Sequence, residues 1–588
     1  MSVDYQFGPR IGADGVTFRL WAPAADRVDL VLAEAHAMRR QGDGWYRLTV
    51  PEAGPSTHYR FRIDGELDVP DPASRYQPDD VHGPSEVIDE AFEWQARDWR
   101  GRPWHECIFL ELHVGAFTGE GAFKAAVNRL DHVADAGFTA IELMPIADFF
   151  GRWNWGYDGV LLFAPDSIYG HPDDLKVLVD AAHQRGLMVF LDVVYNHFGP
   201  EGNYLGRYAP QFFAPANTPW GNAIEYENPM VRRFAIENAL YWLSDFRFDG
   251  LRLDAVHAIL EPGRSMLLRE LSESAGRLAA ESGRQIHLVV ENDANETGLL
   301  DPVTDPPQGK YRAQWNDDYH HAFHVLLTGE TQGYYSDYRE PARHLARALA
   351  EGFAYQGEAS RHRHGAARGE GTAAVPLTAF VNFVQNHDQI GNRPLGERLV
   401  DLASPAALQA ALTVTLLAPC PPLMFMGDEW GAHQSFPFFC DFKGELAEAV
   451  RKGRRREFAE AYRRHGQQIP DPLSEDTFRH ATLDWAAAKK PEHRERLALV
   501  RDLLARRRSF VVPRLPELVP GSGRCEMQES VMLARWNFAT GETLAMLANL
   551  GDAPRRSPKT FKPCQPVWGG IPAGELQPWS VHVTIEVA

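Results

Sequence analysis

Short apolar runs bounded by polar residues divide this chain into strand-like and helix-like segments. From about residue 107 the two kinds alternate, which is typical of repeated βα units around a parallel sheet. Seven strands are clearly indicated: CIFLELHVGAF, TAIELMPI, GLMVFLDVVYNH, FDGLRLDA, IHLVVEND, TAFVNFVQNHD and PPLMFMGDEW. We expect an eighth near YRAQWND, and eight such units would close a (β/α)8 TIM-type barrel, an α/β fold.

Helical patterns separate these strands, at residues 123–136, 173–185, 229–246, 265–282 and 405–417. The segment HPDDLKVLVDAAHQRG has aspartates at its start and glycine at its end, as helix capping favours. The pattern LALVRDLLARRR, at 497–508, predicts the helix that ends the barrel. Irregular insertions interrupt the barrel at 198–228 and 316–380, and long loops of this kind commonly shape access to a site.

The two ends of the chain have a different pattern of apolar and polar residues. Short alternating runs such as GVTFRLWAP and THYRFRID, separated by turn residues, predict an N-terminal β-sandwich over residues 1–97. SVMLARWNF, TLAMLANL and SVHVTIEVA predict a C-terminal β-sandwich over residues 511–588. The catalytic barrel would then occupy residues 98–510.

Composition narrows the class of partner. The net charge of -19 argues against nucleic acid and against anionic membranes, because the chain has no basic surplus to pair with phosphates. A neutral glucan suits this charge, as many other ligands would. The 5 cysteines have no metal-ligand spacing, so neither a zinc site nor a disulfide framework is expected. MSVDYQFGPRIGADG lacks the regions of a secretory signal, and we expect a cytoplasmic protein.

Three carboxylates stand at the ends of predicted strands, and they are the strongest indication of chemistry. Asp254 ends FDGLRLD, Glu291 follows IHLVV, and Asp388 ends FVNFVQNHD. The active site of an α/β barrel is built at the carboxyl ends of its strands, so these acids would meet on one rim. Glycoside hydrolysis needs such a set, with one ionised and one protonated carboxyl group.

Four motifs in order carry a resemblance to a known family. DVVYNH, GLRLDAVH, VVEND and FVQNHD make this chain similar to the α-amylase family of retaining glycoside hydrolases, glycoside hydrolase family 13. The resemblance implies that Asp254 is the nucleophile, Glu291 the general acid/base, and Asp388 a third carboxylate that binds sugar hydroxyls. Arg252, two residues before Asp254 on the same strand face, would keep the nucleophile ionised. Glu291 would need a raised pKa.

The same resemblance suggests residues that bind the substrate. His197 and His387 would contact the reacting sugar, and Tyr157 in NWGYDG would stack on it, with Asp158 as a hydrogen-bonding neighbour. Two roles are equally open for His257, Arg393 and the segment WGNAIEYE. They could bind the leaving group of the substrate, or they could serve only the structure of their loops. Asp192 and Asn196 are expected to shape their own loop.

A closer likeness concerns the substrate. GLRLDAVHAI, VVENDANE, QNHDQIGNRPLGERL, MFMGDEWGAHQSFPFFCDF and VRKGRRREF resemble the members of this family that act on maltooligosyltrehalose. This implies cleavage next to the terminal trehalose. The insertion after the third strand is short and lacks aspartate-rich coordination, so we predict no metal and no cofactor.

Two alternatives stay open. The first is a branching or debranching enzyme of the same family, although branching enzymes typically have a serine before the His-Asp pair of the last motif. The second is a non-catalytic glycan-binding protein that kept the barrel, against which the presence of all three acids argues. Oligomeric state, preferred chain length and glycan binding by the N-terminal region are left undetermined.

Overall fold

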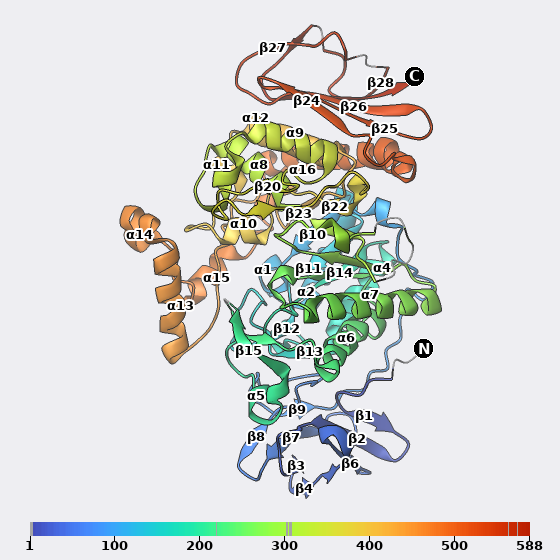
Figure 1. The fold of residues 1–588 in the computed structure, drawn as a ribbon, viewed down its shortest axis with the longest axis vertical. Coiled ribbons are helices and arrows are strands. Elements are labelled where there is room, and N and C mark those ends of the chain that lie inside the picture. The colour runs from blue at the N-terminus through green and yellow to red at the C-terminus, as the bar shows by residue number, and fades with distance from the viewer. Residues whose placement is uncertain are drawn as a thin grey trace.

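The computed structural model of this chain is elongated, with a barrel in the middle and a β-rich region at each end of the long axis (Figure 1). The structure describes residues 4–218, 220–301, 304, 309–561, 564–572 and 574–587. The N-terminal β region is blue in Figure 1, and the C-terminal one is red. Each of these two β regions borders the barrel directly. The barrel itself is built from the middle of the chain.

Eight parallel strands form the barrel, in the order β22-β19-β18-β17-β14-β11-β10-β23. Their bounds are β10 (Phe109–Leu112), β11 (Ala140–Leu143), β14 (Met188–Val193), β17 (Gly250–Leu253), β18 (His287–Val290), β19 (Ala313–Trp315), β22 (Phe380–Val381) and β23 (Leu423–Phe425). The ring closes after β22, where Asn382 pairs in parallel with Pro422 and its carbonyl accepts from Leu423 N at 2.9 Å. The strand expected near YRAQWND is β19, and the predicted barrel is confirmed.

The barrel strands are mostly apolar and are buried on both faces. Every residue of β14 and of β17 is buried, as parallel strands covered by helices require. Gly250 begins β17 at a point of close approach: a Cβ there would lie 2.2 Å from the Phe190 ring and 2.4 Å from the His287 carbonyl oxygen. Only glycine permits that packing, so this residue of the motif GLRLDAVH serves the barrel wall.

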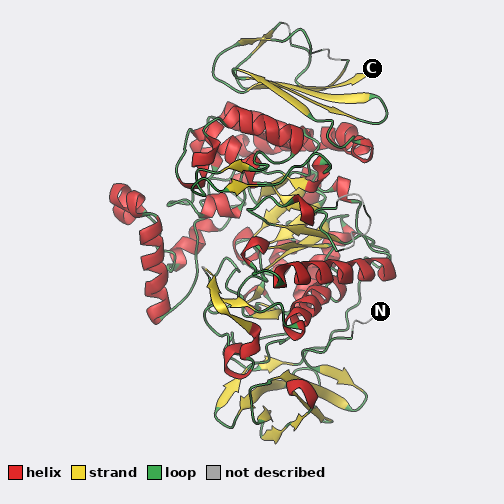
Figure 2. Cartoon of the chain, viewed as in Figure 1, coloured by secondary structure: helices red, strands yellow, loops and turns green. Residues whose placement is uncertain are grey.

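Helices surround the strands, as Figure 2 shows in red. The predicted helices are α4 (Pro172–Gln184), α6 (Pro229–Ser244), α7 (Gly263–Ser282) and α12 (Pro405–Leu417), while the one expected at 123–136 is split into α2 (Phe123–Val127) and α3 (Leu130–Ala136). The split occurs at Asn128 and Arg129, whose ψ angles are -7° and -8° and whose N–H groups donate to carbonyls three residues back. The helix that ends the barrel is α16 (Pro491–Arg506), and the chain continues from it into a π-helical turn.

The two insertions differ in content. The first holds α5 (Leu205–Tyr208) and the hairpin of β15 (Phe213–Thr218) with β16 (Gly221–Ile224). The second was expected to be irregular, but it contains α8 (Asp317–Thr328) and α9 (Pro341–Glu351), which contact one another, before the short hairpin of β20 (Glu358–Ala359) and β21 (Ala367–Arg368). The expectation of an irregular segment was therefore wrong for α8 and α9.

The N-terminal region is a β-sandwich that rests on helix α6. One sheet has the order β1-β2-β6-β5, and the other the order β4-β3-β7-β8 with β9 added to β7. The backbone N–H groups of Gln6 and Phe7 donate to Glu237 of α6, at 2.8 and 3.1 Å. The buried Arg75 guanidinium lies 4.3 Å from the centre of the Tyr241 ring. The strands are β1 (Arg10–Gly12), β2 (Gly15–Trp21), β3 (Val28–Val31), β4 (Ala35–Ala37), β5 (Arg39–Arg40), β6 (Trp45–Val50), β7 (His58–Ile63), β8 (Leu67–Val69) and β9 (Ser85–Glu86).

The C-terminal region has two sheets, with the orders β24-β25-β26-β30-β28 and β27-β29. It packs on α9, where Trp536 Nε1 donates to the Leu349 carbonyl at 2.9 Å. Gly523 lies so close to this helix that a Cβ would stand 2.1 Å from the Ala350 carbonyl oxygen. The strands are β24 (Arg524–Gln528), β25 (Val531–Asn537), β26 (Glu542–Asn549), β27 (Arg555–Arg556), β28 (Gln565–Trp568), β29 (Glu575–Leu576) and β30 (Ser580–Val587).

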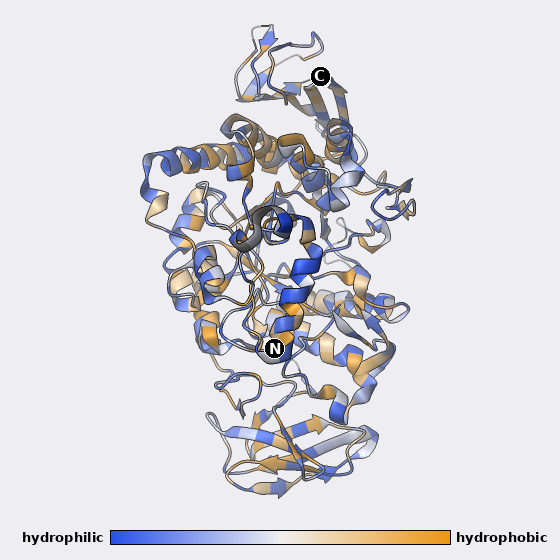
Figure 3. Ribbon diagram, turned by 90° about the vertical axis from the view of Figure 1, so that its left-hand side faces the viewer, coloured by the Kyte–Doolittle hydropathy of each residue, from blue (hydrophilic) through white to orange (hydrophobic). Residues whose placement is uncertain are grey.

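Hydropathy follows this layout. Apolar residues concentrate in the strands, and α13 (Gly444–Glu457), which stands apart from the barrel in Figure 1, is mostly hydrophilic in Figure 3. Among the described residues, no helix combines the length and the apolar character needed to span a membrane. We propose to keep the divisions at residues 97 and 510, because β9 ends at Glu86 and the first C-terminal strand begins at Arg524.

Candidate active site

The three predicted acids stand on one rim of the barrel. Asp254 directly follows β17, and Glu291 directly follows β18. Asp388 lies in the first turn of α10 (His387–Gly391), in the segment that follows β22. All three follow the carboxyl ends of parallel strands in a closed ring, and the barrel brings them together from residues far apart in the sequence.

Arg252 joins the acids from inside the barrel. Its Nη1 lies 2.8 Å from Asp254 Oδ1 and 2.6 Å from Asp192 Oδ2, and its Nη2 lies 2.8 Å from Glu291 Oε2. The side chain is fully buried, and its guanidinium carbon is 4.2 Å from the centre of the Trp315 ring. The predicted contact with Asp254 is present, but Arg252 also reaches the other acid of the pair.

Asp254 is held in its ionised form. Burial alone would raise its pKa, but the charges of Arg252 and His197 and a hydrogen bond from Asn196 together place the pKa below its ordinary value. Asn196 Nδ2 donates to Asp254 Oδ2 at 2.7 Å and to the Asp254 carbonyl at 3.0 Å. Asn196 and Asp192 were expected only to shape their loop, whereas here they contact the nucleophile candidate and its arginine.

The pKa of Glu291 is shifted in the opposite direction. Burial, with the negative charges of Asp254 and Asp388, raises its pKa well above the ordinary value, although Arg252 opposes the shift. Its Oε2 accepts a hydrogen bond from Ala255 N at 2.8 Å, which fixes the carboxyl group beside Asp254. The two neighbouring carboxyl groups thus differ in protonation: one favours the charged form and the other favours the neutral form.

A second chain of contacts runs from Asp192 to the interior acid Glu111. Tyr157 Oη donates to Asp192 Oδ2 at 2.6 Å and lies 2.8 Å from His387 Nε2, with the two rings stacked. His387 Nδ1 pairs with Glu111. Burial would lower the pKa of His387, but the charges of Glu111 and Asp388 outweigh burial and raise it to about 9. The imidazole is therefore a buried cation at neutral pH.

Asp388 is the more open member of the trio. Its side chain is 36% exposed, against 13% for Asp254 and 15% for Glu291. Its Oδ1 lies 3.5 Å from His387 Nε2, and Asn386 caps the helix turn that carries it. The carboxylate is thus left accessible beside a fixed positive charge, in a position to accept hydrogen bonds from a ligand.

His197 and Asp158 lie next to this arrangement but are bound to the protein. His197 Nε2 lies 2.9 Å from the Tyr157 carbonyl, its Nδ1 pairs with Asn196, and its ring stacks on Trp220. Asp158 Oδ2 accepts from Asn154 Nδ2 at 2.7 Å. Contact between these two side chains and a sugar stays a prediction.

His257 and Arg393 also have protein partners. His257 Nδ1 lies 3.3 Å from Asp293 N, and His257 follows Asp254 within a short 3-10 turn. Arg393 Nη1 and Nη2 pair with the Glu330 carboxylate at 2.6 and 3.1 Å. Both residues lie in segments that follow the acids, and their part in recognition remains a prediction.

Sequence reasoning missed several acids of this rim. Glu111 and Glu142 lie within barrel strands β10 and β11, and burial with neighbouring negative charge raises the pKa of Glu142 well above the ordinary value. Asp317 follows β19, and burial, Asp293 and Asp388 raise its pKa to about 7 against the opposing charge of Arg368. The strand-end rule that found the trio, applied to YRAQWND, would have found Asp317. A polar residue inside an apolar strand was the signal for Glu111.

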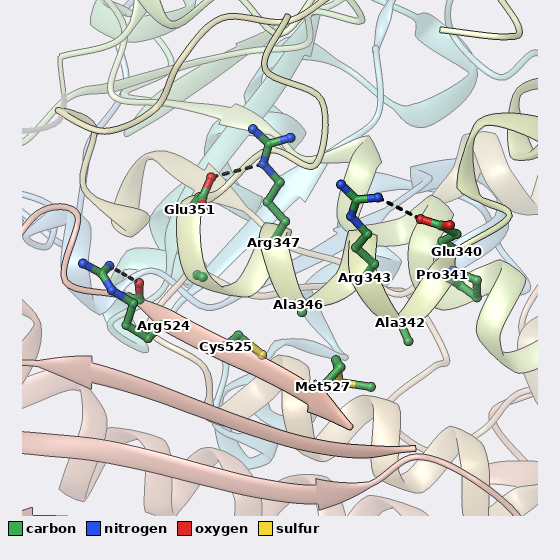
Figure 4. Close-up of a pocket in the computed structure, with 12 residues that line it drawn as sticks. Glu340, Pro341, Ala342, Arg343, Ala346, Arg347, Glu351, Arg524, Cys525 and Met527 are labelled. Carbon is green, nitrogen blue, oxygen red and sulfur yellow. Dashed lines mark hydrogen bonds and ion pairs between the residues drawn. The ribbon is translucent and has the colours of Figure 1, made fainter. Parts of the chain in front are cut away.

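One groove of the molecule is lined by residues other than those of this rim. The groove between α9 and β24 has a volume of about 650 Å³ and lies where the C-terminal region meets the barrel (Figure 4). Its charged residues form ion pairs with one another, Arg343 with Glu340 and Arg347 with Glu351. No three His, Cys, Asp or Glu side chains in the described part of the chain are grouped as ligands for a metal ion.

The chemistry available at the rim follows from the paired acids. An ionised carboxylate next to a protonated carboxyl group is what retaining glycoside hydrolysis uses: one attacks the anomeric carbon while the other protonates the leaving oxygen. The two side chains are only 13% and 15% exposed, so water competes weakly with their interactions.

Two family models match the chain in places that agree with the fold. Residues 6–78 match carbohydrate-binding module 48 (isoamylase N-terminal domain). Residues 111–211 match the alpha amylase catalytic domain. The first covers the N-terminal sandwich, and the second covers the barrel from β10 past β14.

The chain is also similar to whole proteins. A malto-oligosyltrehalose trehalohydrolase of Deinococcus radiodurans is 43% identical over 508 residues, which are 85% of this chain and 82% of that protein. One of Saccharolobus solfataricus is 39% identical over 485 residues, 82% of this chain and 83% of that protein. The crystal structure of a candidate alpha amylase from Salmonella typhimurium has a TM-score of 0.94 and 42% identity, and the match covers 99% of this chain and 100% of that one.

Proposed function

We propose a reaction for this chain from one premise: the chain belongs to the malto-oligosyltrehalose trehalohydrolases, within the α-amylase family of glycoside hydrolases. The reaction is retaining, endo-acting hydrolysis of the α-1,4-glucosidic bond next to the terminal trehalose of maltooligosyltrehalose. It releases trehalose and a shortened malto-oligosaccharide, and so serves trehalose biosynthesis.

The chemistry is assigned to the paired acids. Asp254 attacks the anomeric carbon and forms a covalent glucosyl-enzyme, while Glu291 gives its proton to the oxygen of the leaving trehalose. Glu291, now ionised, then takes a proton from the water that breaks the covalent bond, which restores both groups. The observation that supports this division of roles is the opposite direction of the two pKa shifts.

The surrounding side chains are assigned to the sugar in the reacting position. Asp388 and His387 bind its hydroxyl groups, and Tyr157 presents its ring to the sugar face. Arg252 keeps Asp254 charged. His197, Asp158, His257 and Arg393 are the further substrate-binding candidates, positioned through the protein contacts described above.

The substrate is supported by the identity shared with the trehalohydrolases over most of the chain. Incubation of the purified protein with maltotriosyltrehalose should yield trehalose and maltotriose in equal amounts. Activity on glycogen or amylose that changes linkages without forming reducing ends, and without release of trehalose, would move the assignment to a branching enzyme.

Two further proposals concern the class of ligand and the cellular compartment. The net charge of -19 favours a neutral α-glucan oligosaccharide over nucleic acid or an anionic membrane. A cytoplasmic location is the companion proposal, and fractionation of the source cells would test it.

A further inference from the structure

Glu111 is an acid inside a barrel strand that is otherwise apolar. Its neighbours in β10 are Phe109, Leu110 and Leu112, and Glu111 itself is only 1% exposed. A buried carboxylate destabilises the protein unless hydrogen-bond donors or an opposite charge compensate it. With so little exposed surface Glu111 does not reach a substrate, so any part it has in the reaction must pass through a neighbouring side chain.

That neighbour is His387, which both carboxylate oxygens of Glu111 contact. Oε1 pairs with His387 Nδ1, and Oε2 accepts from the backbone N–H of His387 at 3.2 Å. Trp155 meets the imidazole edge-on at 5.3 Å, and the Tyr157 ring stacks on it at 5.2 Å. Because one carboxylate holds both the backbone and the ring of His387, it fixes the orientation of the imidazole.

The hydrogen bonds beyond the imidazole require a proton on its other nitrogen. The Tyr157 hydroxyl donates its single proton to Asp192 Oδ2 at 2.6 Å. The same hydroxyl oxygen lies 2.8 Å from His387 Nε2, so it accepts there and Nε2 carries a hydrogen. Nδ1 faces the Glu111 carboxylate and carries the second hydrogen, since the pKa of the imidazole is raised to about 9. Both nitrogens of His387 are therefore donors.

Other titratable groups face this imidazole from the elements packed around it. Asp388, from the same helix, supports the positive charge together with Glu111, whereas Arg252 of β17 opposes it. Burial lowers the pKa of His113 to about 4 and, with neighbouring acids, raises that of Glu142 well above its ordinary value, so both are neutral at pH 7. Asp388 Oδ1 lies 3.5 Å from the ring, farther than Glu111. The charge and the orientation of the imidazole thus depend chiefly on Glu111.

We propose that Glu111 is a positioning residue for the hydrolysis, which holds His387 as a charged donor and through it orients Tyr157 and Asp388. The inference rests on the proposed function, in which these three side chains bind the sugar in the reacting position. Hydrogen bonds from a charged donor are shorter and stronger than neutral ones, so a neutral imidazole would hold the Tyr157 hydroxyl less firmly. It would also leave Asp388 without the positive charge beside it.

The test measures the charge of His387 directly, by NMR titration of protein with isotope-labelled histidine. The signal of this ring is the one missing from His387→Gln. Glu111→Gln keeps the size of the side chain but removes its charge, so the titration midpoint should fall by about 1–3 pH units. His387 then loses its charge as the pH rises through the lowered midpoint. Relative to wild type, kcat/KM of Glu111→Gln on maltotriosyltrehalose should be about 10-fold lower at about pH 8 and should recover toward about pH 6.

A double-mutant cycle tests whether Glu111 acts through His387. Once His387→Gln has removed the imidazole, the further change Glu111→Gln should alter kcat/KM by less than about 2-fold. Glu111→Asp keeps the charge at a greater distance, so its titration midpoint and its kcat/KM should lie between those of wild type and Glu111→Gln. This milder change tests the proposal even where Glu111→Gln does not fold.

Glu142→Gln is the matched control for the titration. Glu142 is the register partner of Glu111 on β11, is equally buried and favours the neutral form, so its replacement should leave the midpoint of His387 unchanged. An unchanged midpoint in the Glu111 variants, a loss of activity that is the same at every pH, or a large further loss in the His387→Gln background would each overturn the proposal. A wild-type chain that releases no trehalose would overturn the proposed function, whereas the titration would still show whether Glu111 controls the charge of His387.

Discussion

The acid rim of the barrel and the groove of Figure 4 are lined by similar kinds of residue but balance their charges differently. In the groove, Arg343 and Arg347 each have an acidic partner on the same helix face, and these pairs are exposed to water. At the rim one buried arginine, Arg252, faces three carboxylates. The difference teaches that unbalanced buried charge marks the chemical site of this molecule.

Removal of either of the paired acids at the rim should have the largest effect on activity. Asp254→Ala and Glu291→Gln should each lower kcat on maltotriosyltrehalose by at least about 10³-fold, because the nucleophile or the proton donor is lost. Circular dichroism and thermal unfolding should show that both variants fold. Near-normal turnover of Glu291→Gln would show that another group protonates the leaving oxygen.

Arg252 should come next in effect. Arg252→Lys keeps a positive charge but lacks the planar fork that reaches Asp192, Asp254 and Glu291, so kcat/KM should fall by about 10²-fold. Arg252→Met leaves these carboxylates without their cation and should lower the free energy of unfolding by about 3–5 kcal/mol. Urea unfolding and steady-state kinetics separate the two effects. A fully active Arg252→Met would show that Asp254 does not depend on this charge.

The pH dependence of activity should show a smaller effect of the unbalanced charge at the rim. Activity should fall at high pH as Glu291 loses its proton, and Asp388 contributes to the raised pKa of Glu291. Asp388→Asn removes that negative charge, so the pKa of Glu291 falls and the alkaline limb of kcat/KM should move to lower pH. The control is Asp502→Asn, which removes an exposed carboxylate of α16 that pairs with Arg506 at 2.9 Å. An unmoved limb for Asp388→Asn would mean that Asp388 does not act on Glu291.

The groove should give the smallest effects. Ala342→Trp would fill part of it, and Arg347→Ala would remove two ion pairs, those with Glu351 and Glu358. Exposed pairs contribute about 0.2–1 kcal/mol, so Arg347→Ala should change thermal stability slightly. Both variants should keep kcat and KM within about 2-fold. A larger loss of turnover would show that the groove communicates with the rim.

Much of the fold was predictable because it depends on local pattern. The barrel strands are continuous apolar runs, and even the one near YRAQWND was placed by counting the others. The split of the helix at 123–136 was not predicted, since it depends on a small backbone change at Asn128 and Arg129 that the hydrophobic pattern does not reveal. The helices α8 and α9 were missed because the whole of 316–380 was treated as one irregular insertion. The pattern of α9 was available in the sequence, since Leu345, Ala348 and Leu349 recur at helical spacing and are buried in the structure.

The candidate site also has features that the sequence predicts and features that it does not. The strand-end positions of Asp254, Glu291 and Asp388 follow from the sequence once a barrel is assumed. The contact between Arg252 and Asp254 was predicted because two residues of spacing place them on one strand face. Contact between Arg252 and Glu291 was not, because the two lie on neighbouring strands and their distance depends on register.

By itself, the sequence determined the barrel, the β-rich ends and the identity of the three acids, because periodicity and strand-end position are properties of short segments. Only the tertiary structure decided which acid is charged and which neutral. A pKa depends on burial and on charges within a few ångströms, and at this rim those charges come from several different strands. The same reason separates Asp317 from Asp318 at the start of α8. The two are neighbours in sequence, but the fold gives Asp318 short hydrogen bonds from Ala354 N and Tyr355 N, whereas Asp317 accepts a longer one, of 3.5 Å, from Gln389 Nε2.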